Sequence, residues 1–331
     1  MITFDHVYIE GAARDYPLAR EVLARLRPSH VTEIDDANAF FKRPGQDFAL
    51  QKRSPKLILA RKKGTYLYRG NERIASFGVE RSLFYTDIVR NCLFDCDYCF
   101  LQGMHPSANI LLNVNIEDYL RAVTAHAAQH GALYLSISYL SDLLGFERHF
   151  GLVRRWIEAS RGLEGVEIEV RTKSDGFSEL HDIEPHGGVI LTWSLSPDAL
   201  ARSHEAGTGG FAQRLFDARR AAAAGWRVRL CFDPVIVTDT WRNDYRRAVE
   251  EVFRRMPAGG IEAVSFGVFR LHPDFLRRMR TFRRESILED GIANHDGVAS
   301  YAAEIREEVF AFMTDLLAQE LPRTHIHTVH G

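Results

Sequence analysis

Along most of the chain, short apolar runs alternate with longer stretches in which apolar residues recur every three or four positions. Short runs of this kind are typical of strands buried in a parallel sheet, and the longer stretches are typical of helices that cover such a sheet. We expect strands at 83–89, 133–138, 166–170, 189–194, 228–232 and 263–268. We expect the covering helices near 117–129, 147–160, 210–224, 242–255 and 297–320.

This alternation predicts an α/β fold, because consecutive parallel strands need a long crossover between them. The expected strands are too few for a closed eight-stranded barrel. We therefore expect a partial (β/α)6 TIM-type barrel over residues 81–331, with the last helix at its C-terminal end. In such folds, ligands bind at the carboxyl ends of the strands.

The first 80 residues have a different pattern, which predicts a small N-terminal α+β region over 1–80. Residues 17–26 have helical spacing, and Pro17 suits the first turn of a helix. Residues 56–60 are typical of a strand, and 65–68 of a return strand after the turn at Lys62-Lys63-Gly64. We expect these two strands to form a hairpin.

Composition narrows the class of protein. The 331 residues are 46% hydrophobic and 26% charged, as in a globular domain. The net charge of −2 gives no global attraction to nucleic acid, so DNA binding would need a local basic patch. No apolar run approaches a membrane span, and the N-terminus does not resemble a signal peptide, so we expect a cytoplasmic protein without a membrane partner. The pattern does not predict an oligomeric state.

Three of the four cysteines lie within eight residues, in the spacing C-x3-C-x2-C directly after the first expected barrel strand. Cys92, Cys96 and Cys99 on one tight loop can bind three irons of a [4Fe–4S] cluster and leave the fourth iron open. An open iron can chelate the amino and carboxylate groups of S-adenosylmethionine. One electron from the cluster then yields a 5′-deoxyadenosyl radical.

Other interpretations of this loop stay open. A structural zinc site would need a fourth ligand, for which His105 is near enough in sequence. A simple electron carrier would use a fourth cysteine. A non-catalytic iron–sulfur protein that senses redox state would need only the cluster.

The cysteine spacing before a βα array resembles the radical S-adenosylmethionine superfamily, and Tyr98 beside the last cysteine fits that resemblance. The whole chain further resembles the spore photoproduct lyase family. Segments that carry this likeness include Asp15-Tyr16-Pro17-Leu18, Gly45-Gln46-Asp47, Tyr98-Cys99-Phe100-Leu101-Gln102, Ser141-Asp142, Thr172-Lys173, Ser194-Leu195-Ser196, Glu205-x-Gly207-Thr208 with Arg214, Ala224-Gly225-Trp226 and Phe269-Arg270.

The resemblance implies a lyase that repairs a methylene-bridged thymine dimer in DNA. The adenosyl radical takes a hydrogen atom from the lesion, the bridge breaks, and a hydrogen atom is returned to the product. The implied partners are damaged DNA or a nucleotide and an electron donor such as flavodoxin or ferredoxin. The residues implied to lie near S-adenosylmethionine are Ser141, Lys173, Ser194, Ser196 and Asp233.

This chain departs from the family pattern at two positions. Tyr139 stands where the family has a cysteine that donates hydrogen to the product radical, and Phe100 replaces a second tyrosine. Either Tyr139 and Tyr98 pass the hydrogen atom to the product in a shortened relay without the cysteine, or the enzyme acts on another nucleotide or small molecule. Cys231 is a weaker candidate for the missing thiol, because it lies two residues before Asp233 on an expected strand.

Arginines supply the candidate DNA contacts. Helical spacing places Arg277, Arg280 and Arg284 on one face, which would contact phosphates or remain a solvated helix face. Arg270, at the end of the last barrel strand, would contact the lesion or its phosphate. A dimer lesion must leave the duplex to reach a barrel interior.

Overall fold

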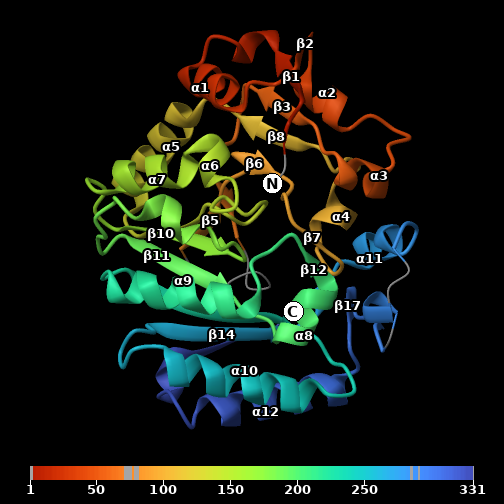
Figure 1. Cartoon of the computed structure of the whole chain (residues 1–331), viewed down its shortest axis with the longest axis vertical. Helices are drawn as coiled ribbons and strands as arrows, with labels where there is room; N and C mark the ends of the chain where they lie inside the picture. Colours follow the sequence, from red (N-terminus) through yellow and green to blue (C-terminus); the bar gives the residue numbers. More distant parts are fainter. Residues whose placement is uncertain (1–2, 71–76, 78–81, 284–285, 290, 331) are drawn as a thin grey trace.

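The computed structural model describes residues 3–70, 77, 82–283, 286–289 and 291–330. A large curled sheet occupies the middle and lower part of Figure 1, and a smaller sheet lies above it. None of the helices in the described part of the chain is long and apolar enough to cross a membrane.

The large sheet has the strand order β18-β14-β13-β11-β10-β9-β5-β4. Its strands are β4 (Tyr68–Arg69), β5 (Leu83–Tyr85), β9 (Leu133–Ser136), β10 (Val166–Thr172), β11 (Val189–Ser194), β13 (Arg227–Val235), β14 (Ala263–Val268) and β18 (Ile326–Val329). All neighbours pair in parallel except β4 and β5. From β5 to β14 the order follows the sequence, which confirms the predicted α/β partial barrel. The final strand β18 was not predicted.

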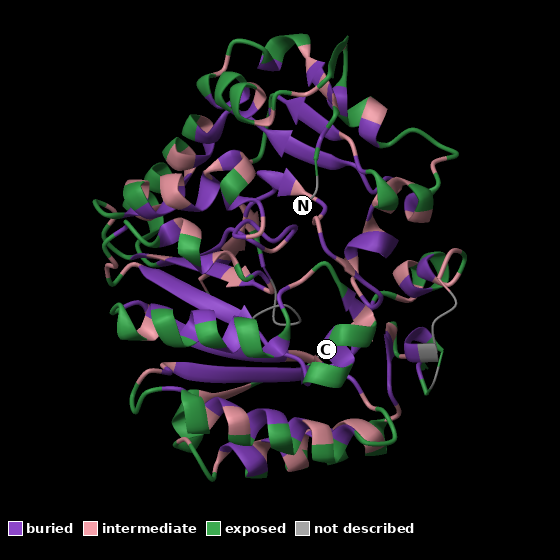
Figure 2. Cartoon of the chain, in the orientation of Figure 1, coloured by how far each residue is buried: buried purple, intermediate pink, exposed green. Residues whose placement is uncertain are grey.

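Helices cover the outer face of this sheet, as Figure 1 shows. They are α5 (Ile116–His130), α6 (Glu147–Phe150), α7 (Leu152–Ser160), α9 (Phe211–Ala223), α10 (Trp241–Arg255) and α12 (Ala303–Leu317). In α10 the buried residues Trp241, Tyr245, Ala248, Val249 and Val252 form a single stripe. Figure 2 shows this division, with buried strands and helices exposed on their outer sides. The inner face of the sheet is thus left for a ligand.

The smaller sheet has the order β2-β1-β3-β8-β6. Its strands are β1 (His6–Glu10), β2 (His30–Ile34), β3 (Leu57–Ala60), β6 (Val89–Arg90) and β8 (Ile110–Asn113), and helices α1 (Pro17–Leu26), α2 (Ala37–Phe41) and α3 (Phe48–Arg53) accompany it. This sheet crosses the expected boundary at residue 80. The expected hairpin is wrong, because β3 pairs with β1 and β8 while Tyr68–Arg69 pairs with β5 in the large sheet.

The expected strand 83–89 is in fact two strands, β5 and β6, which belong to different sheets. Asp87 lies between them and is buried. Its carboxylate accepts hydrogen bonds from Lys62 Nζ at 2.7 Å, Arg90 Nη2 at 2.7 Å and Tyr119 Oη at 2.9 Å. A buried carboxylate needs such hydrogen-bond donors. They hold Asp87 at the point where the chain passes from one sheet to the other.

The open side of the barrel is bordered by α4 (Leu101–Met104), α11 (Pro273–Met279) and a small sheet of β15 (Arg270–Leu271), β17 (Val298–Ser300) and β16 (Ala293–His295). Figure 1 places α11 beside α4. The two helices meet at Gly103, where a Cβ atom would lie 2.3 Å from Cβ of Phe275. Only glycine permits this approach, which brings α11 against the cysteine loop.

Candidate active site

The cysteine loop runs between β6 and α4 and is fixed mainly through its backbone. Lys52 Nζ donates to the carbonyl oxygens of Cys92, at 2.7 Å, and Phe94. Within the loop, β7 (Asp95–Cys96) pairs antiparallel with β12 (Glu205–Ala206), which follows α8 (Asp198–His204). These contacts hold the loop across the carboxyl ends of the barrel strands.

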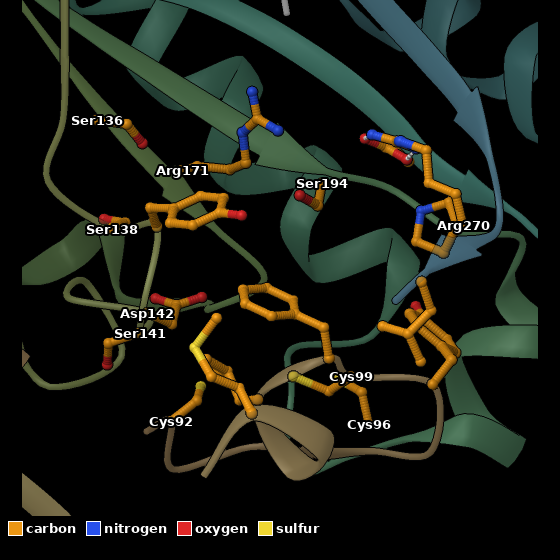
Figure 3. A pocket seen from close by; sticks show the side chains of 18 of the residues that line it. Cys92, Cys96, Cys99, Ser136, Ser138, Ser141, Asp142, Arg171, Ser194 and Arg270 are labelled. Atoms are coloured by element: carbon orange, nitrogen blue, oxygen red, sulfur yellow. Dashed lines mark hydrogen bonds and ion pairs between the residues drawn. The ribbon is translucent and has the colours of Figure 1, made fainter. Parts of the chain in front are cut away.

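All three thiols of this loop line a cavity of about 490 Å³. In Figure 3 they lie together on one side of it, opposite Arg171 and Arg270. Burial, with smaller contributions from the Asp142 charge and the nearby Cys99, raises the pKa of Cys92 to about 12. Burial likewise raises the pKa of Cys96, and Cys99 and Cys92 add to the effect. Buried thiolates this close repel one another unless cations separate them, so the three residues fit a cationic cluster.

A single metal ion has different requirements from a cluster. No group of three His, Cys, Asp or Glu side chains within the described ranges is arranged to hold one ion. A cubane cluster binds each thiolate through a different iron, so its ligands are spaced more widely. Cys231 does not share the cavity: it is buried, and its sulfur accepts a hydrogen bond from Ser265 Oγ at 3.2 Å.

Arg283 clamps the cysteine loop from the C-terminal side. Its guanidinium donates to Gln102 Oε1 at 2.6 Å, to Asp97 Oδ1 at 2.7 Å and to Asp95. Gln102 in turn donates to the carbonyl oxygen of Cys96 at 2.6 Å. The clamp therefore reaches a cysteine backbone through one intermediate side chain and places a cation beside the loop.

Glu205 is the centre of a buried ionic network next to the cysteines. Its carboxylate accepts from Lys173 Nζ at 2.6 Å, and also from Tyr98 Oη and Arg214 Nη2. Burial by itself raises the pKa of Glu205, but the charges of Lys173 and Arg214 outweigh it and hold the pKa far below the usual range. Burial and the adjacent Glu205 charge raise the pKa of Tyr98, so its hydroxyl stays protonated. The network fixes Lys173 and Tyr98 in one orientation.

The residues expected near S-adenosylmethionine occupy two kinds of position. Ser141, Lys173, Ser194 and Asp233 line the cavity. Ser196 is not among the lining residues, and its hydroxyl donates to Glu205 at 2.7 Å. Ser141 Oγ is buried and has no hydrogen-bond partner among the described residues, which fits a hydroxyl that binds a ligand. The roles of these residues in cofactor binding remain predictions.

Aromatic rings form one wall of the cavity. The ring of Tyr139 lies 4.7 Å from that of Tyr85 and 5.4 Å from that of Phe100, centroid to centroid. Burial, with a contribution from Tyr85, raises the pKa of Tyr139 to about 12. Tyr139 is therefore a neutral phenol at physiological pH, among the residues that line the same cavity as the cysteines.

Comparison with known proteins bears directly on this site. The model of the family described as spore photoproduct lyase matches residues 2–277. The chain belongs to the spore photoproduct lyase family. The motif-based resemblance is thereby confirmed, and with it the radical S-adenosylmethionine superfamily.

Individual spore photoproduct lyases are distant in sequence but close in fold. The spore photoproduct lyase of Bacillus subtilis (strain 168) is 23% identical over 258 residues, covering 76% of this chain and 73% of the relative. That of Geobacillus sp. (strain Y412MC61) is 20% identical over 268 residues, covering 78% and 76%. A solved spore photoproduct lyase complexed with dinucleoside spore photoproduct has a TM-score of 0.84 at 18% identity, with 99% of each chain covered. This match confirms the partial barrel.

Within the described residues, the arginines predicted to contact DNA are not gathered into one basic face. Arg277 is exposed and pairs with Asp274 at 2.9 Å. Arg280 turns inward and donates to the carbonyl oxygens of Leu288 and Ile292. Arg284 lies outside the described residues. Arg270 does line the cavity, where it forms a two-bond ion pair with Asp233.

Several residues of the site were not predicted from the sequence. Asp142 lines the cavity and accepts hydrogen bonds from the backbone of Lys173 and from Thr172 Oγ1. Asp142, Glu205 and Arg214 all belonged to segments that resemble the spore photoproduct lyase family, which was a usable signal for them. For Glu169 and Arg171 the signal was weaker: two charged residues at alternate positions of a strand.

Proposed function

We propose that this chain repairs a methylene-bridged thymine dimer in DNA by radical chemistry, as a carbon–carbon lyase. The observation that carries the proposal is that the three cysteines and the Tyr139 ring line the same cavity. A radical formed at the cysteine side and a hydrogen donor on the wall then face the same substrate. Family membership supports the proposal, and a related structure is described with AdoMet and dinucleoside spore photoproduct bound.

In this proposal, Cys92, Cys96 and Cys99 hold a [4Fe–4S] cluster, and Ser141, Lys173, Ser194, Ser196 and Asp233 surround S-adenosylmethionine. When bound, these cofactors supply a 5′-deoxyadenosyl radical after one electron arrives from a donor such as flavodoxin or ferredoxin. The chain itself binds and orients the lesion. Its apolar walls exclude water, so that the radical does not escape.

Tyr139 is the proposed source of the hydrogen atom that completes the product. Its O–H bond breaks homolytically and a C–H bond forms on the product radical. The tyrosyl radical then regains one electron from the reduced flavodoxin- or ferredoxin-type donor and one proton from solvent. Tyr98 is less suited to this role, because its hydroxyl already donates to Glu205 and accepts from Lys173 at 2.5 Å. The hydroxyl of Tyr139 has no hydrogen-bond partner among the described residues, and Tyr139 lines the cavity.

A second candidate is the same radical chemistry on another nucleotide or small molecule. The observation that favours it is the charge inside the cavity, where Arg270 pairs with Asp233 and Arg171 pairs with Glu169. Such pairs are suited to a substrate with polar groups at both ends. The absence of a cysteine at position 139 points the same way.

One assay separates the two candidates. The protein is reconstituted with iron and sulfide, reduced anaerobically and given S-adenosylmethionine with a dinucleotide that carries the lesion. Formation of both 5′-deoxyadenosine and thymidylyl-thymidine is the expected result. Formation of 5′-deoxyadenosine alone would overturn the proposed substrate and favour the second candidate. If neither product forms, the chain is not acting as this radical enzyme.

A further inference from the structure

We infer that Glu169 and Arg171 form a subsite that recognises the imide edge of a pyrimidine, the N–H group flanked by two carbonyls that thymine presents. This inference rests on the proposed function and adds to it the group of the substrate that is recognised. Both residues lie on β10, at alternate positions, and both line the cavity. Figure 3 shows Arg171 away from the cysteine loop, on the side of the cavity where Ser136 and Ser138 lie.

The pairing of these two side chains leaves one donor and one acceptor for a ligand. Arg171 donates through Nε, at 3.2 Å, and Nη2, at 2.9 Å, to the same oxygen of Glu169, Oε1. No hydrogen bond from a described residue reaches Glu169 Oε2, and Nη1 of Arg171 has no such partner either. A free N–H donor and a free carboxylate oxygen therefore belong to two side chains that are bonded to each other. An imide offers the complementary pair, a carbonyl oxygen beside an N–H.

Electrostatics favour a neutral ligand over an anion at this subsite. Burial lowers the pKa of Arg171, but the surrounding negative groups, Glu169 first and then others such as Asp233, together outweigh that effect and raise it, so the guanidinium stays charged. The Glu169 side chain is only 3% exposed and remains paired with Arg171. The pair is neutral as a whole, and a second anion beside Glu169 would be repelled. A neutral imide satisfies both groups without adding charge.

Two neighbouring features suit the rest of a pyrimidine ring. Ser138 Oγ is buried, lines the cavity and lacks a hydrogen-bond partner among the described residues, so it can donate to the second carbonyl. It lies two residues beyond Ser136, which pairs in register with Glu169. The rings of Tyr85, Tyr139 and Phe100 provide flat surfaces in the same cavity, on which a base can stack.

The test uses binding to the reconstituted, unreduced protein with S-adenosylmethionine present, so that no turnover is needed. The probes are thymidine, N3-methylthymidine, cytidine and the dinucleoside form of the lesion. For the wild type we expect N3-methylation to weaken thymidine binding by about tenfold or more, because a buried carboxylate oxygen loses its donor. In the double variant Glu169→Leu/Arg171→Leu, methylation should change the affinity by less than about twofold.

Two further variants keep the test decisive. Glu179→Leu/Arg148→Leu removes an Arg–Glu pair outside the cavity, which is bonded at 2.9 Å, and should retain the wild-type selectivity. Glu169→Gln keeps the size of the side chain but places an NH2 donor against the imide N–H. We expect its preference for thymidine over cytidine to fall even if the double variant does not fold.

The outcomes separate this inference from the proposed function. Imide-selective binding without conversion of the lesion would support the subsite and overturn the proposed function. Conversion of the lesion with no effect of N3-methylation, or with an equal effect in wild type and variants, would overturn the subsite alone. No binding of thymidine or of the lesion would overturn the subsite too.

Discussion

The ammonium of Lys173 lies 2.6 Å from Oε1 of Glu205, inside the folded core beside the cysteine loop. Lys173 therefore has a resident carboxylate partner before any cofactor binds. The same carboxylate holds the Tyr98 hydroxyl and Arg214. Glu205 is thus the residue on which the geometry of this side of the site depends most.

Glu205 should stabilise the fold through its charge. Replacing it with Gln leaves Arg214 and Lys173 buried without a counter-charge, which costs about 3–5 kcal/mol of unfolding free energy for a broken buried pair. The measurement is denaturant unfolding of the wild type and of Glu205→Gln. A variant as stable as the wild type would contradict the role of the network. Glu164→Gln, a substitution of an exposed glutamate, is the matched control.

The depressed pKa of Glu205 also predicts a pH dependence. The pKa of this group is lower in the folded chain than in the unfolded chain, where it is about 4.3. Its contribution to stability is therefore fully present above the unfolded pKa and is lost as the pH falls below it. When the pH is lowered from about 6 to about 3, the unfolding free energy should decrease more steeply in the wild type than in Glu205→Gln. Parallel curves would show that Glu205 does not carry this linkage.

The predicted cluster ligands are tested by absorbance. In Cys96→Ala, we expect reconstitution with iron and sulfide to give no stable thiolate-to-iron absorption band, because one iron loses its ligand. Cys231→Ala is the control, because Cys231 lies outside the cavity and should leave the band unchanged. A full band in Cys96→Ala would remove this residue from the ligand set.

The clamp on the cysteine loop predicts an electrochemical effect. Arg283→Met removes a cation beside the loop and takes one ion-pair partner from each of Asp95 and Asp97, of which Asp97 keeps His204. Added negative charge disfavours reduction, so the midpoint potential of the bound cluster should become more negative. Arg277→Met is the control, since Arg277 is exposed and pairs with Asp274 instead. Equal potentials in wild type and Arg283→Met would contradict the clamp.

The hydrogen donor is tested with a substitution that removes a single oxygen. In Tyr139→Phe, the ring is kept and 5′-deoxyadenosine should still form, whereas repaired product per 5′-deoxyadenosine should fall about tenfold or more. Tyr85→Phe, which alters the neighbouring ring in the same way, should retain the wild-type ratio. An unchanged ratio in Tyr139→Phe would exclude Tyr139 as the donor.

How far the sequence predicts this structure depends on how local each signal is. The strands from β9 to β14 and the cysteine loop were predicted, because apolar runs and cysteine spacing are local patterns. The split of 83–89 into two strands was missed, because it depends on Lys62 and Tyr119, which lie far away in sequence and meet Asp87 only in the folded chain.

The polar lining of the cavity was the hardest part to predict. Glu169 and Arg171 alternate with apolar residues on β10, which indicates one polar face but not what that face meets. That information depends on the register with β9 and β11 and on the position of the cysteine loop above the barrel. Similarly, helical spacing placed Arg280 on an exposed face, whereas the carbonyl oxygens of Leu288 and Ile292 draw it inward.

The most direct test of the account is to run the repair reaction in deuterated water with the dinucleotide lesion and to analyse the product by mass spectrometry. Hydroxyl protons exchange with solvent, so a hydrogen atom delivered by Tyr139 becomes deuterium. We predict thymidylyl-thymidine that carries one deuterium in the wild type. Thymidylyl-thymidine without deuterium would contradict Tyr139 as the donor, and 5′-deoxyadenosine without any thymidylyl-thymidine would contradict the repair function itself.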